Sequence, residues 1–119
     1  MIFELVVTES HEGVAVISIL GELEMANAPR LRGELISLVG ARNEPLIVLD
    51  LAGVDLIDAT GLGVIFEGVK RTRLRGGDLA LARAETQVQR ELDLMRVSEI
   101  LPVHPSVEEA CRTLLAARA

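Results

Sequence analysis

The segment LIVLDL, residues 46–51, restricts the fold of this chain more than any other stretch. Five of its six side chains are aliphatic, and the exception is Asp50. Such a continuous apolar run is typical of a strand in a parallel sheet, because helices cover both faces of that strand. The run is also far too short to span a bilayer, which takes about 20 residues. The segment therefore predicts a covered strand inside an α/β domain.

Strands are predicted at five places, where alternating or short apolar runs stand between turn signals. They are Ile2–Thr8, Val14–Leu20, Leu46–Leu51, Asp78–Ala82 and Ile100–Val103. The first two are separated by the turn signal HEG, His11–Gly13. We therefore expect them to form a hairpin.

Helices are predicted where apolar residues recur at intervals of three and four. They are Ala28–Gly40, a helix containing Leu62 to Val69 that ends near Gly76, Thr86–Met95, and a last helix opened by Ser106. Asn27 is the expected N-cap of the first helix, and Glu109 completes a capping box with Ser106. A hairpin followed by β-α-β-α alternation predicts one α/β domain over residues 1–119, with a mixed sheet of four to five strands packed with about four helices.

Composition and charge disfavour several classes of function. The chain has 18 acids against 12 bases, for a net charge of −6. A nucleic-acid binder needs a basic surface that neutralises phosphates, so direct nucleic-acid binding is not expected. The basic run Lys70–Arg75 is the one contrary signal, and at the end of a helix it favours a solvated face whose cations suit the helix dipole.

The N-terminus and the single cysteine bear on cellular location. The first residues carry no basic region followed by an apolar stretch and a cleavage site, so no secretion signal is expected. Cys111 has no partner for an internal disulfide, and its setting favours a small apolar residue on a helix face over a reactive thiol. These features predict a cytoplasmic protein without membrane insertion.

The segment LIDATGLGVIFEG, residues 56–68, places two acids, a hydroxyl and glycines between two apolar stretches. A dinucleotide fingerprint requires G-x-G-x-x-G, and Phe66 stands where the third glycine should be. A P-loop requires Gly-Lys-Ser/Thr after four spacer residues, and the chain contains none. We therefore predict no nucleotide cofactor here.

The acids near this segment are candidates for a metal site. Asp50, Asp55 and Asp58 could supply oxygen ligands, which hard cations favour. Acids before a helix are nevertheless common, because they cap the helix and suit its dipole. The second interpretation is preferred, and no metal is predicted.

Nucleophilic catalysis by Thr60 would require an activating base. The chain has two histidines, His11 and His104, and both are expected in surface loops. No catalytic triad can be assembled from these residues. The chain is therefore not expected to be an enzyme.

A hydroxyl presented at a strand-to-helix junction remains. With Asp58 as the expected N-cap, Thr60 falls in the first turn of the helix. Gly61 and Gly63 leave little side-chain bulk, so a partner could approach closely. Alternatively, Thr60 helps to cap the helix and the glycines pack against a neighbouring element. The residues alone support both interpretations equally.

The stretch VLDLAGVDLIDATGLGVI resembles the signature of STAS domains, and more closely that of bacterial anti-sigma factor antagonists. In that family an aliphatic strand is followed by Asp-Ser-Ser/Thr-Gly-Leu-Gly at the start of a helix. Gly21–Leu35 is similar to the family's Gly-Glu-Leu-Asp segment and the following helix, and Ile100–Ala110 to its C-terminal stretch. The resemblance covers nearly the whole chain and implies a single STAS domain.

The resemblance also implies a partner switch. The unmodified antagonist would bind an anti-sigma factor with serine/threonine kinase activity and so free the sigma factor. Phosphorylation of the motif hydroxyl, which is Thr60 in this chain, would break the complex, and a metal-dependent phosphatase would restore it. An alternative is a STAS subunit of a membrane (lipid) transport system, which would act as a constitutive docking module.

By motif position, the resemblance assigns further residues to the partner-binding surface. Asp58 would help to present the hydroxyl or contact the partner, Gly61 and Gly63 would shape the helix start, and Glu24 would lie at the same end of the sheet. Glu24 stands where the family more often has Asp, and Thr60 stands where Ser is commoner. The apolar composition permits a monomer or a homodimer.

Overall fold

The computed structural model describes residues 2–10 and 12–118. Its strands are β1 (Glu4–Glu9), β2 (Ala15–Leu23), β3 (Leu46–Ile57), β4 (Asp78–Ala82) and β5 (Val103–His104). Its helices are α1 (Ala28–Gly40), α2 (Ala59–Leu74), α3 (Thr86–Leu94) and α4 (Val107–Arg118), with a 3₁₀ turn, η1 (Val97–Glu99), after α3. The prediction of one α/β domain is confirmed. His11, expected in the hairpin turn, lies outside the described residues.

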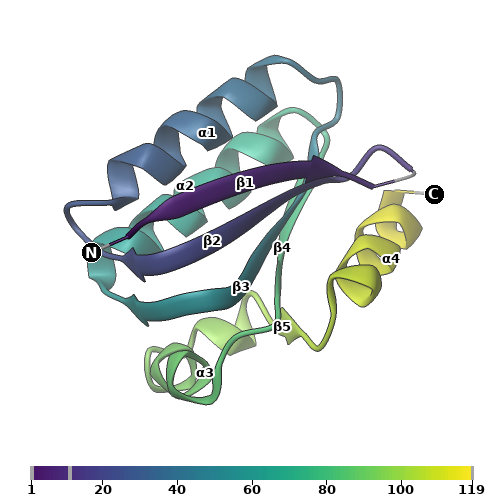
Figure 1. Cartoon of the computed structure of the whole chain (residues 1–119). Coiled ribbons are helices and arrows are strands. Elements are labelled where there is room, and N and C mark those ends of the chain that lie inside the picture. Colours follow the sequence, from purple (N-terminus) through teal and green to yellow (C-terminus); the bar gives the residue numbers. More distant parts are fainter. Residues whose placement is uncertain (1, 11, 119) are drawn as a thin grey trace.

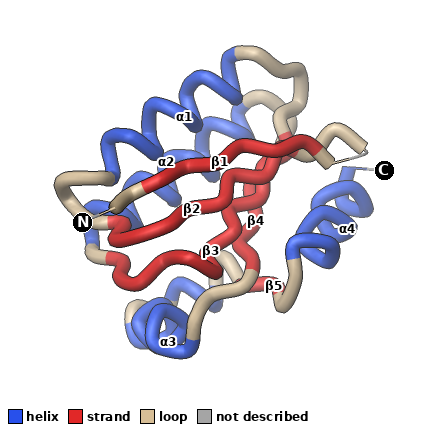
Figure 2. Tube along the Cα trace, in the orientation of Figure 1, coloured by secondary structure: helices blue, strands red, loops and turns tan. Residues whose placement is uncertain are grey.

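The five strands form one sheet in the order β1-β2-β3-β4-β5. β1 pairs antiparallel with β2 in the expected hairpin, and the other neighbours pair in parallel, so the sheet is mixed as predicted (Figure 2). Because β2 and β3 are parallel, Leu23 at the end of one strand pairs with Ile57 at the end of the other. The segments that follow both strands therefore start from the same edge of the sheet.

Helices cover the two faces of the sheet unequally (Figure 1). α1 and α2 lie side by side over one face, and their leucines and valines share a core with the sheet and with Val88 and Leu92 of α3. α4 covers part of the other face, where Val16 and Val48 pack against Cys111. β3 is therefore apolar on both sides along LIVLDL, as the sequence predicts.

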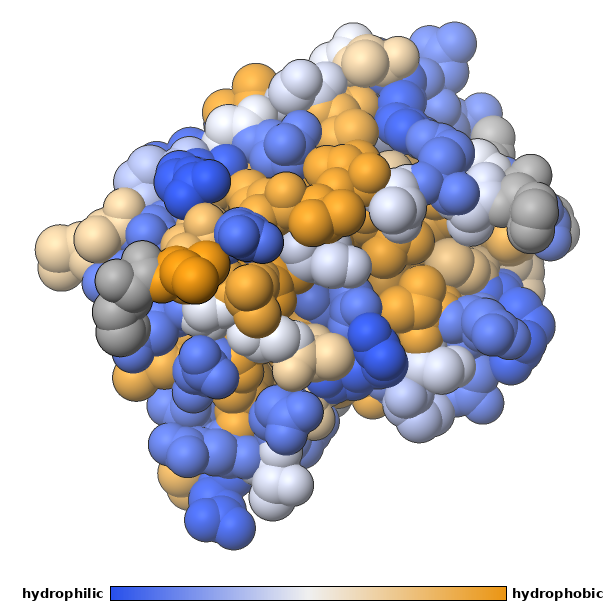
Figure 3. All heavy atoms as spheres, viewed as in Figure 1, coloured by the Kyte–Doolittle hydropathy of each residue, from blue (hydrophilic) through white to orange (hydrophobic). Residues whose placement is uncertain are grey.

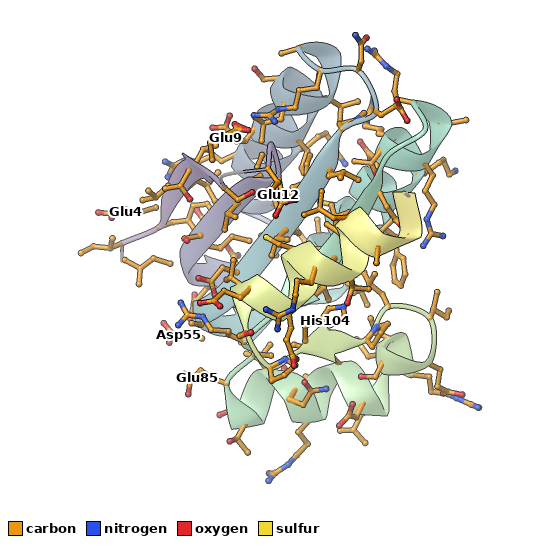
Figure 4. The ribbon with its side chains drawn as sticks, turned by 90° about the vertical axis from the view of Figure 1, so that its right-hand side faces the viewer. Glu4, Glu9, Glu12, Asp55, Glu85 and His104 are labelled. Carbon is orange, nitrogen blue, oxygen red and sulfur yellow. The ribbon has the colours of Figure 1, made fainter. Side chains whose placement is uncertain are left out.

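On this second face, α4 leaves the part of the sheet formed by β1 and β2 uncovered. Figure 3 shows apolar side chains gathered on this face among hydrophilic ones. Val6 of β1 and Leu20 of β2 are 52% and 45% exposed. Glu4, Asp55 and Glu85 project from the same side of the molecule in Figure 4. This surface is thus apolar at its centre, with charged side chains of both signs around it, including Glu4 and Arg83.

The end of the chain differs from the sequence prediction. The last strand covers Val103–His104 instead of Ile100–Val103. The N–H groups of Ile100 and Leu101 both donate to the carbonyl of Val97, which closes a turn and keeps them out of the sheet. His104, expected in a surface loop, is a half-buried residue of β5.

Other local predictions are confirmed or adjusted. The hydroxyl of Ser106 accepts the N–H of Glu109 at 3.1 Å, as expected for the cap of α4. Met95, predicted as the last residue of the third helix, instead follows α3, which ends at Leu94, and is 40% exposed. The basic run Lys70–Arg75 lies on the last turns of α2 and is exposed except for Thr72, so it is the solvated face that the sequence favours. Within the described residues, no helix is long and apolar enough to cross a membrane.

Candidate functional site

The start of α2 is built around Asp58. The strand β3 ends at Ile57, the helix begins at Ala59, and Asp58 between them is the N-cap. Its Oδ1 accepts the main-chain N–H of Gly61 at 2.8 Å, and its main-chain oxygen accepts the N–H of Leu62 at 2.9 Å. The first bond satisfies an N–H group that a helix start leaves without a partner, and the second is the first main-chain hydrogen bond of the helix. The predicted N-cap is confirmed.

Asp58 also joins this helix start to the end of β2. Its second carboxylate oxygen, Oδ2, accepts the main-chain N–H of Met25 at 3.1 Å. The N–H of Asp58 donates to the carbonyl of Leu23 at 3.2 Å. The two segments meet because β2 and β3 end at the same edge of the sheet. One side chain thus holds together the start of α2 and the loop before α1.

Thr60 lies in the first turn of α2 and is exposed to solvent. Asp58 caps the helix, and the Thr60 hydroxyl makes no hydrogen bond with the part of the chain that the structure describes. The interpretation of Thr60 as a capping residue therefore has no support in these contacts. An unbonded hydroxyl on the surface is accessible to a modifying enzyme or a partner.

The two glycines of the motif differ in their surroundings. Gly61 is buried, and a Cβ at this position would lie 2.2 Å from the carbonyl oxygen of Leu23. Gly63 is exposed, and a Cβ there would meet nothing within 4 Å. Only Gly63 leaves open surface, whereas Gly61 allows the helix to pack against the end of β2. In each interpretation of the sequence, by contrast, the two glycines are treated alike.

Glu24 lies at the expected end of the sheet, but its carboxylate turns back to its own loop. The Oε2 atom accepts the N–H of Ala26, and Oε1 accepts the N–H of Asn27, both at 3.2 Å. Asn27 occupies the predicted N-cap position of α1, yet its side chain makes no cap bond and donates instead to the carbonyl of Glu22 at 2.9 Å. The half-buried Glu24 thus shapes the loop after β2.

The three acids weighed as metal ligands have separate environments. Asp58 caps α2, Asp55 is exposed on β3, and Asp50 is buried and paired with Arg83. Within residues 2–10 and 12–118, no group of three or more His, Cys, Asp or Glu side chains could hold a metal ion.

The pair of Asp50 and Arg83 is a feature that sequence reasoning missed. Arg83 donates from Nε at 3.0 Å and from a terminal nitrogen at 2.7 Å to the two carboxylate oxygens of Asp50. Desolvation by burial raises the pKa of Asp50, but hydrogen bonds from Arg83 and Ala52 and the charge of Arg83 outweigh it and hold this pKa below its ordinary value. The lone acid within LIVLDL was the signal that a cation would be needed there.

Cys111 is a buried residue of α4 and belongs to the core between this helix and the sheet. Burial, and to a smaller extent the negative charge of Glu12, raise the pKa of its thiol. A thiol whose pKa is raised is less nucleophilic near neutral pH, because less thiolate is present. The expectation of a small apolar residue is confirmed.

Comparison with known proteins agrees with this architecture. The STAS domain family model matches residues 6–110. The chain is 29% identical over 106 residues to the anti-sigma F factor antagonist of Paenibacillus polymyxa, and this alignment covers 89% of the chain and 91% of that protein.

Solved structures share the fold. An anti-sigma factor antagonist from Mycobacterium paratuberculosis superposes with a TM-score of 0.81 at 24% identity, over 95% of this chain and 94% of that one. The anti-sigma factor antagonist SpoIIAA in its unphosphorylated form gives a TM-score of 0.77 at 14% identity, over 95% and 97% of the two chains. SpoIIAA in its phosphorylated form gives 0.66 at 16% identity, over 94% and 98%. Because the family model spans most of the sequence and the sheet and helices match these folds, this chain belongs to the STAS domain family.

Proposed function

We propose that this chain is an anti-sigma factor antagonist that is switched by phosphorylation at Thr60. Its unphosphorylated form binds an anti-sigma factor and so releases the sigma factor. The names of its relatives support this function. The observation that carries the switch is the exposed, unbonded hydroxyl of Thr60 on a helix start that Asp58 already caps.

A phosphate on Thr60 would reject the partner without unfolding the domain. It adds about −1.5 to −2 charges near pH 7. The N-terminus of a helix accommodates an anion, so α2 can retain its structure. Within an interface, however, the phosphate would lie close to Asp58, and like charges placed together there cost several kcal/mol. A loss of about 1.4 kcal/mol already lowers affinity tenfold.

The proposed switch requires two cytoplasmic enzymes. The anti-sigma factor itself supplies the serine/threonine kinase activity, and a metal-dependent serine/threonine phosphatase removes the phosphate. SpoIIAA, a structural relative, is known in phosphorylated and unphosphorylated forms, which supports this cycle. In it, the present chain is a substrate and a binding module.

The alternative is a STAS subunit of a membrane (lipid) transport system with a constitutive docking surface. The alignment with the antagonist from Paenibacillus polymyxa spans 91% of that protein, which favours the regulatory function.

The deciding experiment combines the chain with its cognate anti-sigma factor and ATP, followed by mapping of the phosphorylated residue by mass spectrometry. We expect one phosphate, located on Thr60, and none on the Thr60→Ala variant. Phosphorylation at another residue, or none by an anti-sigma factor shown to bind the chain, would refute the assignment of Thr60.

A further inference from the structure

The loop between β2 and α1 exposes a large apolar side chain at the end of the sheet that carries Thr60. Met25 in this loop is 70% exposed. Its main-chain N–H bonds to Asp58, the residue that caps the helix of Thr60. A flexible, polarisable thioether is thus exposed in a loop that is bonded to the start of α2, the helix that carries Thr60.

The loop around Met25 is held by hydrogen bonds on both sides. Asp58 fixes the N–H of Met25, and the Glu24 carboxylate accepts the N–H groups of Ala26 and Asn27. The carbonyl of Glu24 also accepts the N–H of Asn27 at 3.0 Å. A side chain displayed on a fixed backbone loses less conformational freedom when a partner binds it. The exposure of Met25 is therefore a property of the folded loop.

The charged and the apolar side chain of this loop have different surroundings. The Glu24 carboxylate bonds to its own backbone, whereas Met25 points to solvent. Methionine is enriched in the cores of protein interfaces, and its unbranched chain adapts to irregular apolar pockets. Glu24 is thus suited to positioning the loop, and Met25 to contacting a partner.

We infer that Met25 is the apolar anchor of the partner-binding surface and inserts into an apolar pocket of the anti-sigma factor, while Glu24 positions it. This inference rests on the proposed function and assigns the contact that accompanies the Thr60 hydroxyl. The carboxylate of Asp58 connects the loop of Met25 to the helix of Thr60. One of its oxygens accepts the N–H of Met25, and the other accepts the N–H of Gly61 in the first turn of α2. A partner that reads the hydroxyl would cover Met25 as well.

The first test is the affinity of Met25 variants for the cognate anti-sigma factor, measured by isothermal titration calorimetry. We expect Met25→Ala to bind about tenfold more weakly or worse, and Met25→Leu to stay within about threefold of wild type, because it keeps the apolar volume. Leu94→Ala, at a side chain 78% exposed at the C-terminal end of α3, is the matched control and should bind as wild type. All variants should keep the wild-type thermal midpoint.

Oxidation by hydrogen peroxide is a second test, with an internal control. Met25 and Met95 are both accessible, at 70% and 40% exposure. In the complex, sulfoxide formation at Met25 should slow about tenfold, while the rate at Met95 should stay unchanged. Equal rates at Met25 in the free and bound chain would overturn the inference.

The role of Glu24 is tested by a double-mutant cycle. If Glu24 acts through Met25, Glu24→Ala weakens binding in the wild-type background and adds little in the Met25→Ala background. Additive losses would instead assign Glu24 a contact of its own. Wild-type affinity of Met25→Ala, together with weakened binding of Thr60→Glu, would overturn the anchor and leave the proposed function intact. Failure of the wild-type chain to bind any anti-sigma factor kinase would overturn both.

Discussion

Asp58 and Met25 are 33 positions apart in the chain, yet Oδ2 of Asp58 accepts the main-chain N–H of Met25 at 3.1 Å. The other oxygen of the same carboxylate caps α2 through Gly61. The helix that carries Thr60 and the loop that carries Met25 are therefore held in one geometry by one side chain. Substitutions around this carboxylate separate the stability of the domain from its proposed function.

Replacing Asp58 should cost stability through both of its oxygens. Removal of an N-cap side chain costs about 0.5–2 kcal/mol, so we expect Asp58→Ala to lower the free energy of unfolding by about 1–2 kcal/mol. Asp58→Asn keeps a good cap and should lose less. Urea unfolding measures the difference, and hydrogen exchange at the Met25 amide should become faster in the alanine variant. Unchanged exchange at Met25 would show that this bond does not hold the loop.

The glycines of the motif provide a matched pair of substitutions. Gly61→Ala would place a Cβ 2.2 Å from the carbonyl oxygen of Leu23, so the end of β2 or the start of α2 must shift. We expect a loss of about 2 kcal/mol or more, in the range of overpacked sites.

Gly63→Ala should have the opposite effect on stability. Its Cβ meets nothing within 4 Å, and alanine is favoured over glycine in a helix by about 1 kcal/mol. Thermal unfolding should therefore rank Gly63→Ala above wild type and Gly61→Ala below it. A Gly63→Ala protein that is stable but binds the anti-sigma factor more weakly would locate Gly63 within the interface.

The side chain of Thr60 should affect binding and leave folding unchanged. It is exposed and its hydroxyl is not needed for the cap, so Thr60→Ala and Thr60→Glu should both give the wild-type circular dichroism spectrum. We expect Thr60→Ala to keep affinity for the anti-sigma factor and Thr60→Glu to lose about tenfold or more, through repulsion beside Asp58. Unfolding of the Thr60→Glu protein would instead indicate that the hydroxyl has a structural role.

Replacing Arg83, the cation that pairs with Asp50, should change the pH dependence of the free energy of unfolding relative to wild type. The pKa of Asp50 is lowered in the folded protein, so this carboxylate stabilises the fold above its unfolded pKa of about 3.9 and loses that effect as pH falls through the lower folded pKa. Arg83→Gln leaves a buried, unpaired carboxylate at pH 7, and we expect a loss of about 1–3 kcal/mol. The difference from wild type should shrink as pH falls below about 4 and Asp50 becomes protonated.

Arg73→Gln is the control for this experiment. Arg73 pairs with Asp78 at 3.0 Å, but both side chains are at least one-third exposed. Pairs at the surface contribute about 0–1 kcal/mol, so the variant should remain close to wild type throughout the pH range. A loss at pH 7 as large as that of Arg83→Gln would contradict the importance of burial at Asp50.

Much of the fold follows from patterns within short segments. The limits of α1 and β4 agree with the prediction from periodicity, because hydrophobic spacing and the Gly-Gly turn before β4 are local signals. The cap by Asp58 is also local, since it joins residues three positions apart. Prediction is weaker where pairing with a neighbouring strand sets the end of a strand. β3 extends six residues past LIVLDL to Ile57, because β2 pairs with it through two register shifts.

The sequence by itself therefore determined the α/β class, the hairpin and the Asp58 cap. Only the tertiary structure decided that Met25 is exposed beside Asp58, that Gly61 faces Leu23 while Gly63 faces solvent, and that Arg83 neutralises Asp50. The physical reason is the register between parallel strands. It brings together groups about 33 positions apart in the chain, and no local periodicity encodes which of them will meet.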